Sequence, residues 1–566
     1  MPEPVVRGVR HALGIRPVFK TVDTCAAEFA AETPYYYSAY DEESEVVPRE
    51  RPAVIILGSG PNRIGQGVEF DYCCVHAALA ARDLGHAAIM VNCNPETVST
   101  DHGVSDRLYM EPLTLGTVLD ICEREQPRGV ITQLGGQTPL RLARGLEAAG
   151  VPLLGTSADS IELAEDRERF GDLLTELGLI APPWSIAKHP DELIERAREV
   201  GFPALVRPSF VLGGRAMAIV YNEAELETYL ETERPRWPVL IDRFLENAIE
   251  LDVDALADGT DCHIGAILEH VEAAGVHSGD SACVIPPQEV GPAVIDEITT
   301  TTQKLVRALG AVGLVNVQYA YQDGTLYIIE ANPRASRTVP FVAKATGVPL
   351  VRHAVQLMLG AGIADLAIPA AAPAWHVAVK EAVLPFSRFP TADPALGPEM
   401  RATGEVMGIG RSFAEAYAKA QAGAGSALPH SGSVALSAAP GDKPRMVAVA
   451  RQLVDAGFSL IATEGTAAAV RAAGLPVHTV GKIRESGTDI PTLIAQGTVD
   501  LVINTPSGRE AQGDGGAIRR AAVAVGVPYI TTMEAAEAAA LAVRSDRLTP
   551  VALQDLFGTT ALSTST

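Results

Sequence analysis

Residues 315–334 read VNVQYAYQDGTLYIIEANPR, and this stretch predicts a β-hairpin. Apolar and polar side chains alternate on both sides of Asp323-Gly324, a dipeptide that is typical of the tight turn between antiparallel strands. The period of two assigns one strand face to Ile328, Glu330 and Asn332, and the other face to Tyr327, Ile329 and Ala331. The hairpin therefore gathers polar side chains on one face.

The length of the turn decides which residues face each other. A three-residue loop with Gly324 in the left-handed conformation places Gln318 opposite Glu330. A two-residue turn places Gln318 opposite Ile329 instead. In the first register a carboxylate lies between two amide oxygens, a set that suits Mg²⁺, so the candidate metal ligands are Gln318, Glu330 and Asn332.

Two arginines follow the hairpin directly. The planar forks of Arg334 and Arg337 can hold a carboxylate-like substrate and the oxygens of a phosphoryl group in transfer. Metal and guanidinium together would neutralise the charge of a phosphotransfer transition state. The candidate catalytic residues are therefore Glu330, Asn332, Arg334 and Arg337. The alternative is an ordinary hairpin with a solvated glutamate and surface arginines.

Three glycine-rich segments accompany the hairpin. VRPSFVLGGRAM at 206–217 can close its backbone over phosphates, with Arg207 nearby, or form a simple turn. GVHSGDSA at 275–282 offers further backbone N–H groups. GSGPNRIGQG at 58–67 follows a strand, but its spacing and the sequence Asn92-Cys93-Asn94 after the next strand do not suit NAD. We expect 94–101 and 135–140 to form a substrate wall at that sheet edge.

Apolar runs divide the chain into several folding units. Short runs at 53–57, 87–92, 129–132 and 151–155 predict a parallel sheet covered by helices. Longer alternating strands at 203–208, 215–221, 238–245 and 249–257, with helices at 223–233 and 292–308, indicate an α+β domain. The segment 421–433 has a linker composition. A second βαβ series follows, with strands at 432–437, 458–462, 477–480, 499–503 and 528–530 and helices at 444–456 and 514–525.

Composition excludes several classes of protein. The formal charge of −24 over 566 residues opposes binding to a nucleic acid backbone. The seven cysteines form no C-x-x-C pair, and we expect reduced thiols in a cytoplasmic protein. Because Pro, Gly or a charge interrupts every longer apolar run, we expect neither a signal peptide nor a membrane span.

The motifs above, with NCNPETVSTD, QLGGQTPL, IIEANPRASRTVPFVAKATGVPL, KEAVLPF and GPEMRATGEVMG, closely resemble the carboxyl-terminal half of the carbamoyl-phosphate synthetase large subunit. The resemblance covers nearly the whole chain. It implies an α/β and α+β multidomain fold: the end of a helical oligomerisation region at 1–50, a pre-ATP-grasp parallel sheet at 51–158, an ATP-grasp domain with an extension at 159–420, the linker, and a methylglyoxal-synthase-like α/β regulatory domain at 434–566.

The activity implied by the resemblance is phosphorylation of carbamate by ATP, a step toward pyrimidines and arginine. The implied ions are Mg²⁺ or Mn²⁺, and K⁺ is allowed. The implied ATP site consists of Arg167, Arg207, Gly213, Gly214, Arg243, Leu245, Glu250, Gly275, Val276, His277, Ser278, Gln318 and Glu330. Glu272, Asp280, Glu381 and Leu384 match positions where some relatives bind ornithine.

The C-terminal domain resembles the family's nucleotide-regulated domain. Thr463 and Thr466 in TEGT stand at a predicted helix N-terminus, where free N–H groups favour phosphate. Lys443, Lys482, Asn504 and Ser507 would complete a site for an effector nucleotide. Helix capping and solvated lysines are the alternative interpretation.

The family's large subunit has a homologous first half that this sequence lacks. The resemblance therefore implies three partners: the missing N-terminal synthetase half, a glutaminase small subunit, and further copies in an oligomer. No G-x-C-x-G nucleophile motif surrounds any cysteine, so glutamine hydrolysis would fall to the partner. Two other functions stay open: a nucleotide-binding regulatory or assembly fragment, and another ATP-grasp carboxylate–amine ligase.

Overall fold

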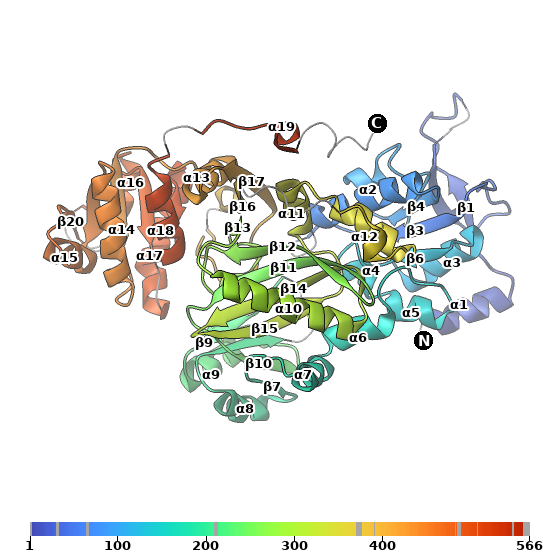
Figure 1. Ribbon diagram of the computed structural model, residues 1–566, viewed down its shortest axis with the longest axis horizontal. Helices are drawn as coiled ribbons and strands as arrows, with labels where there is room; N and C mark the ends of the chain where they lie inside the picture. The colour runs from blue at the N-terminus through green and yellow to red at the C-terminus, as the bar shows by residue number, and fades with distance from the viewer. Residues whose placement is uncertain are drawn as a thin grey trace.

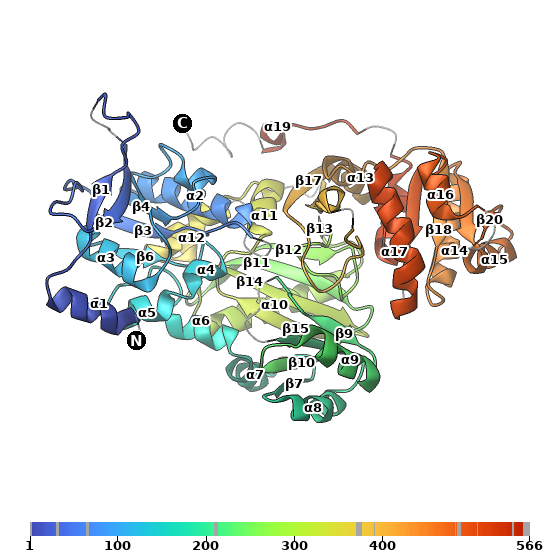
Figure 2. The ribbon, with the colours of Figure 1, turned by 180° about the vertical axis from the view of Figure 1, so that it is seen from behind.

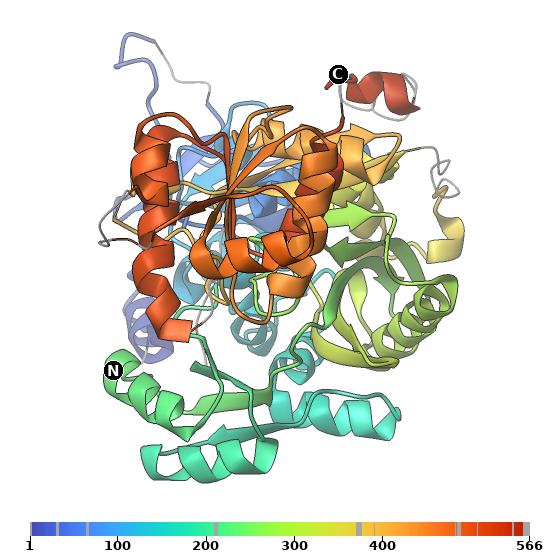
Figure 3. The same ribbon diagram turned by 90° about the vertical axis from the view of Figure 1, so that its left-hand side faces the viewer.

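The computed structural model contains four β-sheets arranged along an elongated molecule (Figure 1). It describes residues 3–29, 33–63, 67–208, 213–368, 376–389, 391–481, 483, 488–505, 508–545 and 548–557. The first sheet lies at one end, the largest sheet in the middle, and the C-terminal sheet at the other end. The three views agree on this order (Figures 1, 2 and 3).

The first sheet has six strands in the order β1-β2-β5-β4-β3-β6 and is parallel except at β1. Its strands are β1 (Val18–Thr21), β2 (Tyr35–Ala39), β3 (Ala53–Leu57), β4 (Ala87–Asn92), β5 (Arg107–Met110) and β6 (Gly129–Ile131). Its helices are α1 (Glu3–Ala12), α2 (Val68–Asp83), η1 (Val98–Thr100), α3 (Leu115–Glu125), α4 (Gln137–Leu140) and α5 (Ala143–Ala148). Successive residues of β3 and β4 enter cores on opposite faces, which explains their unbroken apolar runs.

Two expectations for this region need correction. Val18–Thr21 and Tyr35–Ala39 are not helical: they form β1 and β2, which extend the sheet, because Phe19 and Tyr36 pack their rings against Tyr109 of β5. Only α1 is helical in the described part of 1–50. Residues 151–155 do not form a strand but a single bridge from Leu153 to Val130.

The central region contains an antiparallel four-stranded sheet, β7-β10-β8-β9, and an antiparallel seven-stranded sheet, β15-β14-β11-β12-β13-β16-β17. The smaller sheet comprises β7 (Trp184–Ala187), β8 (Ala204–Pro208), β9 (Ala218–Val220) and β10 (Val239–Arg243). The larger comprises β11 (Ile249–Asp258), β12 (Cys262–His270), β13 (Cys283–Ile285), β14 (Val312–Gln322), β15 (Thr325–Asn332), β16 (Val377–Val383) and β17 (Gly404–Gly410).

Helices cover both central sheets. They are α6 (Ala158–Glu165), α7 (Arg167–Glu176), η2 (Pro190–Glu192), α8 (Leu193–Val200), α9 (Glu223–Glu233), α10 (Pro292–Leu309), α11 (Val339–Thr346), α12 (Leu350–Met358), η3 (Ile363–Asp365), η4 (Phe386–Arg388) and α13 (Phe413–Gly423). One apolar core joins α2, α11 and α12 to both the first sheet and the seven-stranded sheet. The first sheet and the central sheet therefore share a core.

The C-terminal sheet is parallel in the order β20-β19-β18-β21-β22. Its strands are β18 (Ser433–Ser437), β19 (Ser459–Thr463), β20 (His478–Val480), β21 (Leu501–Asn504) and β22 (Tyr529–Ile530). Its helices are α14 (Lys443–Asp455), α15 (Glu464–Ala472), α16 (Ile490–Ala495), α17 (Gly508–Val525) and α18 (Met533–Ala542). The short helix α19 (Leu553–Phe557) follows.

The predicted linker is partly helical, since α13 continues to Gly423. Across the part of the chain that the structure describes, no helix is both long and apolar enough to cross a membrane.

Candidate functional site

The hairpin reaches the expected pairing by an unexpected route. Gln322 pairs with Thr325, so Asp323 and Gly324 form a two-residue turn, and both have positive φ. This turn alone would place Gln318 opposite Ile329. A β-bulge shifts the register between Gln318 and Tyr319, and Gln318 therefore pairs with Glu330.

The bulge also changes the faces of β15. Leu326, Ile328 and Ala331 enter one apolar core, whereas Tyr327 and Ile329 pack against another cluster. The expectation that Ile328 shares a face with Glu330 is wrong, because the extra residue reverses the alternation. The bulge turns Glu330 away from the core and beside Gln318.

Gln318 lies opposite Glu330 in the strand pair, and the three candidate metal ligands form two separate hydrogen bonds. Asn332 Nδ2 donates to Glu330 Oε1 at 2.8 Å, and Gln318 Nε2 donates to Ser278 Oγ at 3.4 Å. All three side chains are half-buried. Their carboxylate and amide oxygens suit a hard cation once the Asn332 amide turns its oxygen toward Glu330.

Arg334 and Arg337 are half-buried and have no carboxylate partner among the described residues. Arg334 donates to Asn332 Oδ1 at 3.0 Å and to the Ala335 carbonyl at 2.9 Å, while its Nε has no partner. Arg337 contacts Met400 Sδ. Burial lowers the pKa of both guanidinium groups, and neither forms an ion pair with any carboxylate of the described residues. Two desolvated cations on one loop form a site for an anion.

The edge of the first sheet supports this loop. Gln133 donates from Nε2 to the Pro333 carbonyl at 2.5 Å, and the backbone carbonyl of Gln133 accepts from Ala335 N–H at 3.0 Å. Phe70, in the first turn of α2, lies 5.9 Å from the Arg334 guanidinium. At the same edge, the Asn92 side chain accepts from Gly60 N–H at 3.0 Å. The sheet edge thus contacts the loop that carries the arginines, and the assignment of 94–101 and 135–140 to a substrate wall stays a prediction.

Two acidic side chains on β11, Asp252 and Asp254, were not predicted. Glu250, Asp252 and Asp254 alternate along one face, opposite the strand that carries Gln318. His270 lies between the first two, with Nε2 2.8 Å from Asp252 and Nδ1 3.3 Å from Glu250. Burial alone would lower the pKa of His270, but Cys283 and Asp252 outweigh it and raise this pKa well above its usual value. The period of two in ELDVD at 250–254 was the available signal.

Asp242 on β10 organises two arginines of the expected ATP site. Its carboxylate forms ion pairs with Arg167 and, at 3.3 Å, with Arg207. Arg167 also donates to the carbonyl of the bulged Ile329 at 2.9 Å. Arg243 points elsewhere and donates to the Phe202 carbonyl, while Leu245 is buried. Asp242 was not anticipated, because no local pattern singles it out.

The glycine-rich segments 213–217 and 275–282 both contact a third loop, residues 391–402. Gly213 accepts from Met400 N–H at 3.0 Å, and a Cβ on Gly214, at φ +69°, would clash with the Pro398 carbonyl. His277 N–H donates to the Gly397 carbonyl at 2.8 Å. Burial and nearby Arg337 lower the pKa of His277 to about 3. Ser278, Gly275 and Val276 belong to the same 275–282 segment, and Gly275 has φ +111°.

The structure describes the contacts of all four residues matched to an ornithine position. Glu272 and Glu381 are neighbours: burial raises their pKa values to about 7 and about 8, and repulsion by Glu272 adds to the shift of Glu381. Asp280 instead accepts from the N–H groups of Arg401 and Ala402, each at 2.8 Å. Leu384 packs in a small apolar cluster.

The candidate effector residues line the carboxyl edge of the C-terminal sheet. Thr463 and Thr466 stand at the start of α15, but Thr466 Oγ1 accepts from Ala438 N–H at 3.0 Å. Lys443 lies near Gly465. Asn504 donates to the Ser437 carbonyl at 3.2 Å and accepts from Arg519. Lys482 and Ser507 lie outside the described residues.

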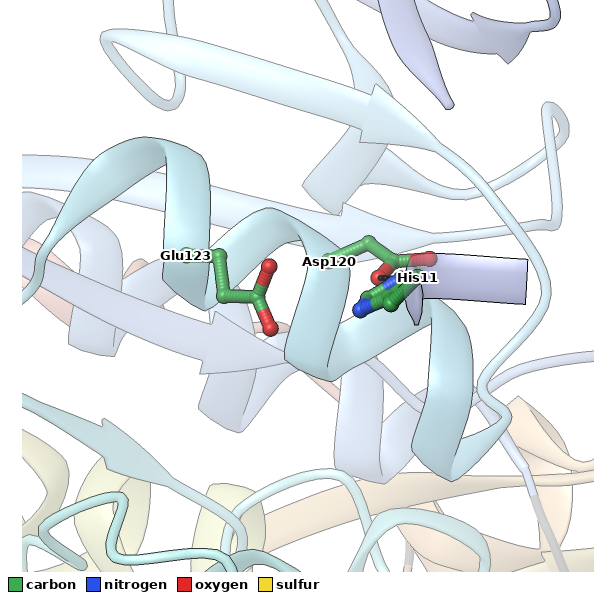
Figure 4. A group of neighbouring side chains, drawn as sticks. All are labelled: His11, Asp120 and Glu123. Atoms are coloured by element: carbon green, nitrogen blue, oxygen red, sulfur yellow. Dashed lines mark ion pairs between the residues drawn. The ribbon is translucent and has the colours of Figure 1, made fainter. Parts of the chain in front are cut away.

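A second group with metal-ligand chemistry joins α1 to α3 (Figure 4). The candidate ligand atoms of His11, Asp120 and Glu123 lie within 4.8 Å of one another. Arg7 bridges both carboxylates at 2.6 Å, and Arg16 binds Glu123 at 2.6 Å. Because arginines already neutralise these acids, the group is an ion-pair network between two helices.

Three family models match the chain. They are the carbamoyl phosphate synthase preATP-grasp domain at residues 50–163, the carbamoyl-phosphate synthase L chain ATP binding domain at 166–366, and the MGS-like domain at 445–531. With the observed sheets, these matches confirm the expected multidomain fold class of a pre-ATP-grasp sheet, an ATP-grasp domain and a methylglyoxal-synthase-like domain.

Whole proteins show the same similarity. The carbamoyl phosphate synthase large chain of Kocuria rhizophila is 53% identical over 573 residues, covering 97% of this chain and 52% of that protein. The large chain of Archaeoglobus fulgidus is 55% identical over 548 residues, covering 96% and 51%. The chain spans about half the length of the curated relatives it matches.

Among solved structures, the biotin carboxylase domain of a single-chain bacterial carboxylase aligns with a TM-score of 0.50 at 18% identity. The alignment covers 66% of this chain and 88% of that chain. At such low identity the likeness concerns the fold alone.

Proposed function

This chain belongs to the carbamoyl phosphate synthase large-chain family, and from that premise we propose that its central site phosphorylates carbamate with ATP. A carbamate oxygen forms a bond to the γ-phosphorus, the bond to the bridging oxygen breaks, and ADP leaves. The products are carbamoyl phosphate and ADP.

One observation carries the proposal. Arg334 and Arg337 are half-buried cations whose pKa values are lowered by burial and that have no carboxylate partner in the described residues, and they follow closely after Glu330 and Asn332. Leaving two guanidinium groups desolvated is costly unless an anion joins them. Carbamate and the phosphoryl oxygens are anions of suitable shape for planar forks. In this arrangement the arginines orient the acceptor and stabilise the charge of the transition state.

The nucleotide would bind between the two central sheets. Arg167 and Arg207, held by Asp242, and the segments 213–214 and 275–278 supply cations and backbone N–H groups. Glu250 and the buried Leu245 would bind the nucleoside part, and Arg243 would act at the periphery. Glu330, Gln318 and Asn332 would hold Mg²⁺, or Mn²⁺ in its place, which would bridge phosphate oxygens and neutralise charge. K⁺ is a further proposed ion.

We divide the chain into 51–158, 159–420 and 434–566, and assign the last part to regulation by a nucleoside monophosphate. The residues for this site are Lys443, Lys482, Thr463, Thr466, Asn504 and Ser507, and Glu272, Asp280, Glu381 and Leu384 form a second effector position. The proposed partners are an N-terminal synthetase half, a glutaminase small subunit and further copies of the chain. The proposed location is the cytoplasm.

The test is the reverse reaction: ATP formation by the isolated chain from carbamoyl phosphate and ADP with Mg²⁺. We expect activity that Glu330→Gln lowers by at least about 100-fold, the scale for loss of a group that stabilises transition-state charge. Mn²⁺ binding, followed by electron paramagnetic resonance without substrate, should weaken in the same variant.

The matched control is Glu227→Gln, an exposed carboxylate on α9, which should change neither measurement. Folded protein that makes no ATP, or a Glu330→Gln variant equal to the parent, would refute the assignment. Monophosphate binding without Mg²⁺–ATP binding would favour a purely regulatory fragment. ATP turnover that depends on a different acid and amine would indicate another ligase.

A further inference from the structure

Arg519 of α17 is fully buried where the C-terminal domain meets the central region. Its Nε and Nη2 donate to the two carboxylate oxygens of Asp393 at 2.7 and 2.5 Å. Burial alone would raise the pKa of Asp393, but its hydrogen bonds with Arg519 outweigh this and lower the pKa. A bidentate pair with a buried guanidinium fixes both position and orientation.

Asp393 belongs to the 391–402 loop, which touches the candidate ATP site at several points. Backbone bonds join Met400 to Gly213 and His277 to Gly397, and Arg337 contacts Met400 Sδ. Further along the loop, the N–H groups of Arg401 and Ala402 bind Asp280. The loop therefore contacts the glycine-rich segments 213–217 and 275–282, and it also contacts Arg337.

The remaining nitrogen of the Arg519 guanidinium, Nη1, reaches Asn504, one of the candidate effector residues. Its Nη1 donates to the side-chain oxygen of Asn504, at the carboxyl end of β21, and Asn504 in turn donates to the Ser437 carbonyl at 3.2 Å. One guanidinium thus joins the edge of the parallel sheet, where Thr463 and Lys443 also lie, to the loop that contacts the central site. A phosphate bound at Asn504 would compete for, or reorient, the amide that Arg519 holds.

We propose that Asp393 and Arg519 are positioning residues that fix the 391–402 loop against the candidate ATP site and transmit phosphate binding at Asn504 to it. The claim that the loop acts on an ATP site rests on the proposed function. The claims that Asp393 and Arg519 order the loop, and that a ligand at Asn504 changes it, do not. A simple bridge between domains would hold the two parts together without ordering the loop or responding to a ligand at Asn504.

Amide hydrogen exchange separates these possibilities without requiring turnover. In Asp393→Asn the N–H groups of His277, Met400, Arg401 and Ala402 should exchange about tenfold faster, because the loop loses its charged anchor. In the parent chain, one of AMP, GMP, CMP or UMP should change the exchange of the same N–H groups. In the variant that response should disappear while calorimetry still detects nucleotide binding.

The control is Glu537→Gln, which removes the bidentate partner of Arg445 within the C-terminal domain at similar distances of 2.9 and 2.8 Å. It should leave the loop unchanged. Amides of β18 and β21 report whether the C-terminal domain stays folded. If Asp393→Asn unfolds, Arg519→Lys replaces it, since lysine keeps the charge but cannot form the fork.

Unchanged loop exchange in both variants would overturn the positioning role. A loop response to nucleotide that survives in Asp393→Asn, or no response to any of the four nucleotides in the parent, would overturn the transmission. If the parent makes no ATP, the proposed function fails, but the exchange results still decide this inference. If the parent is active, a raised KM for ADP with a preserved kcat in Asp393→Asn links the loop to nucleotide binding.

Discussion

At the residue scale, Asp254 illustrates how one buried carboxylate anchors the loop that carries Arg337. It accepts from Ser336 Oγ at 2.7 Å, from Thr338 Oγ1, and from Asn316 Nδ2 at 3.1 Å. Ser336 and Thr338 flank Arg337, so the carboxylate holds the loop segment that presents this arginine. Burial nevertheless raises the pKa of Asp254 to about 6.

This pKa predicts a specific pH dependence of stability. The unfolded carboxyl has its ordinary pKa of 3.8, so between the two values the folded chain retains a proton that the unfolded chain has lost. The group therefore stabilises the fold at low pH, and this contribution is lost as the pH rises through about 6. Between pH 5 and pH 7 the loss through this group amounts to about 1 kcal/mol.

Asp254→Asn removes the titration and keeps the shape. Unfolding of both proteins, followed by amide exchange in β11 and β14, should show the parent losing stability relative to the variant from pH 5 to pH 7. A difference that stays constant over this range would mean that Asp254 does not change its protonation there.

At the element scale, the hairpin shows both the reach and the limit of sequence patterns. The alternation and Asp323-Gly324 predicted two strands and a turn but left the register open, because the two-residue turn that forms would by itself place Gln318 opposite Ile329. They could not predict the bulge, because it depends on long-range contacts: Arg167 binds the Ile329 carbonyl, and Ile328 and Ala331 fill one core. The strand faces were wrong for the same reason.

The contact of Gly214 with the 391–402 loop gives a prediction at this scale. In Gly214→Ala the added Cβ would meet the Pro398 carbonyl and lie 3.3 Å from Glu399 Cα, so the 213–217 and 391–402 segments must separate. We expect a KM for ADP raised about tenfold, since a strained left-handed residue and a lost contact together cost roughly 1–2 kcal/mol. Steady-state ATP formation measures this change.

Gly425→Ala is the matched control, because Gly425 also has a positive φ of +85° but no atom within 4 Å of an added Cβ. It should cost stability through strain alone and leave the KM unchanged. Equal KM values in both variants would show that the Gly214 contact does not shape the nucleotide site.

At the scale of the whole molecule, local patterns predicted the parallel sheets well and the connections between them poorly. Apolar runs identified β3, β4, β18, β19 and β21, whose burial on both faces leaves a simple signal. The strands β1 and β2 lack that signal, and Asp242 and Arg519 act through residues far away in the sequence. Such contacts follow from the tertiary fold and leave no local period.

One further long-range contact joins α19, near the C-terminus of the chain, to the central region. After the C-terminal sheet the chain turns back, and α19 lies above α11 of the central region (Figures 1 and 2). The Phe557 ring meets His376 edge-on at 6.1 Å and lies over Gly347, where a Cβ would come within 2.8 Å of it. Leu553 and Leu556 pack against the core that joins the first sheet to the central sheet.

Phe557→Ala should therefore destabilise the central region, although the residue follows the C-terminal sheet in the sequence. Truncation of a fully buried phenylalanine costs about 3–5 kcal/mol, and a half-buried one should cost about half as much. Thermal unfolding and limited proteolysis between α18 and α19 measure the effect. Phe29→Ala is the control, because Phe29 is 75% exposed and should change neither measurement. Equal thermal unfolding midpoints for the two variants would mean that α19 does not stay docked in solution. The core shared by the first and central sheets would then not include α19.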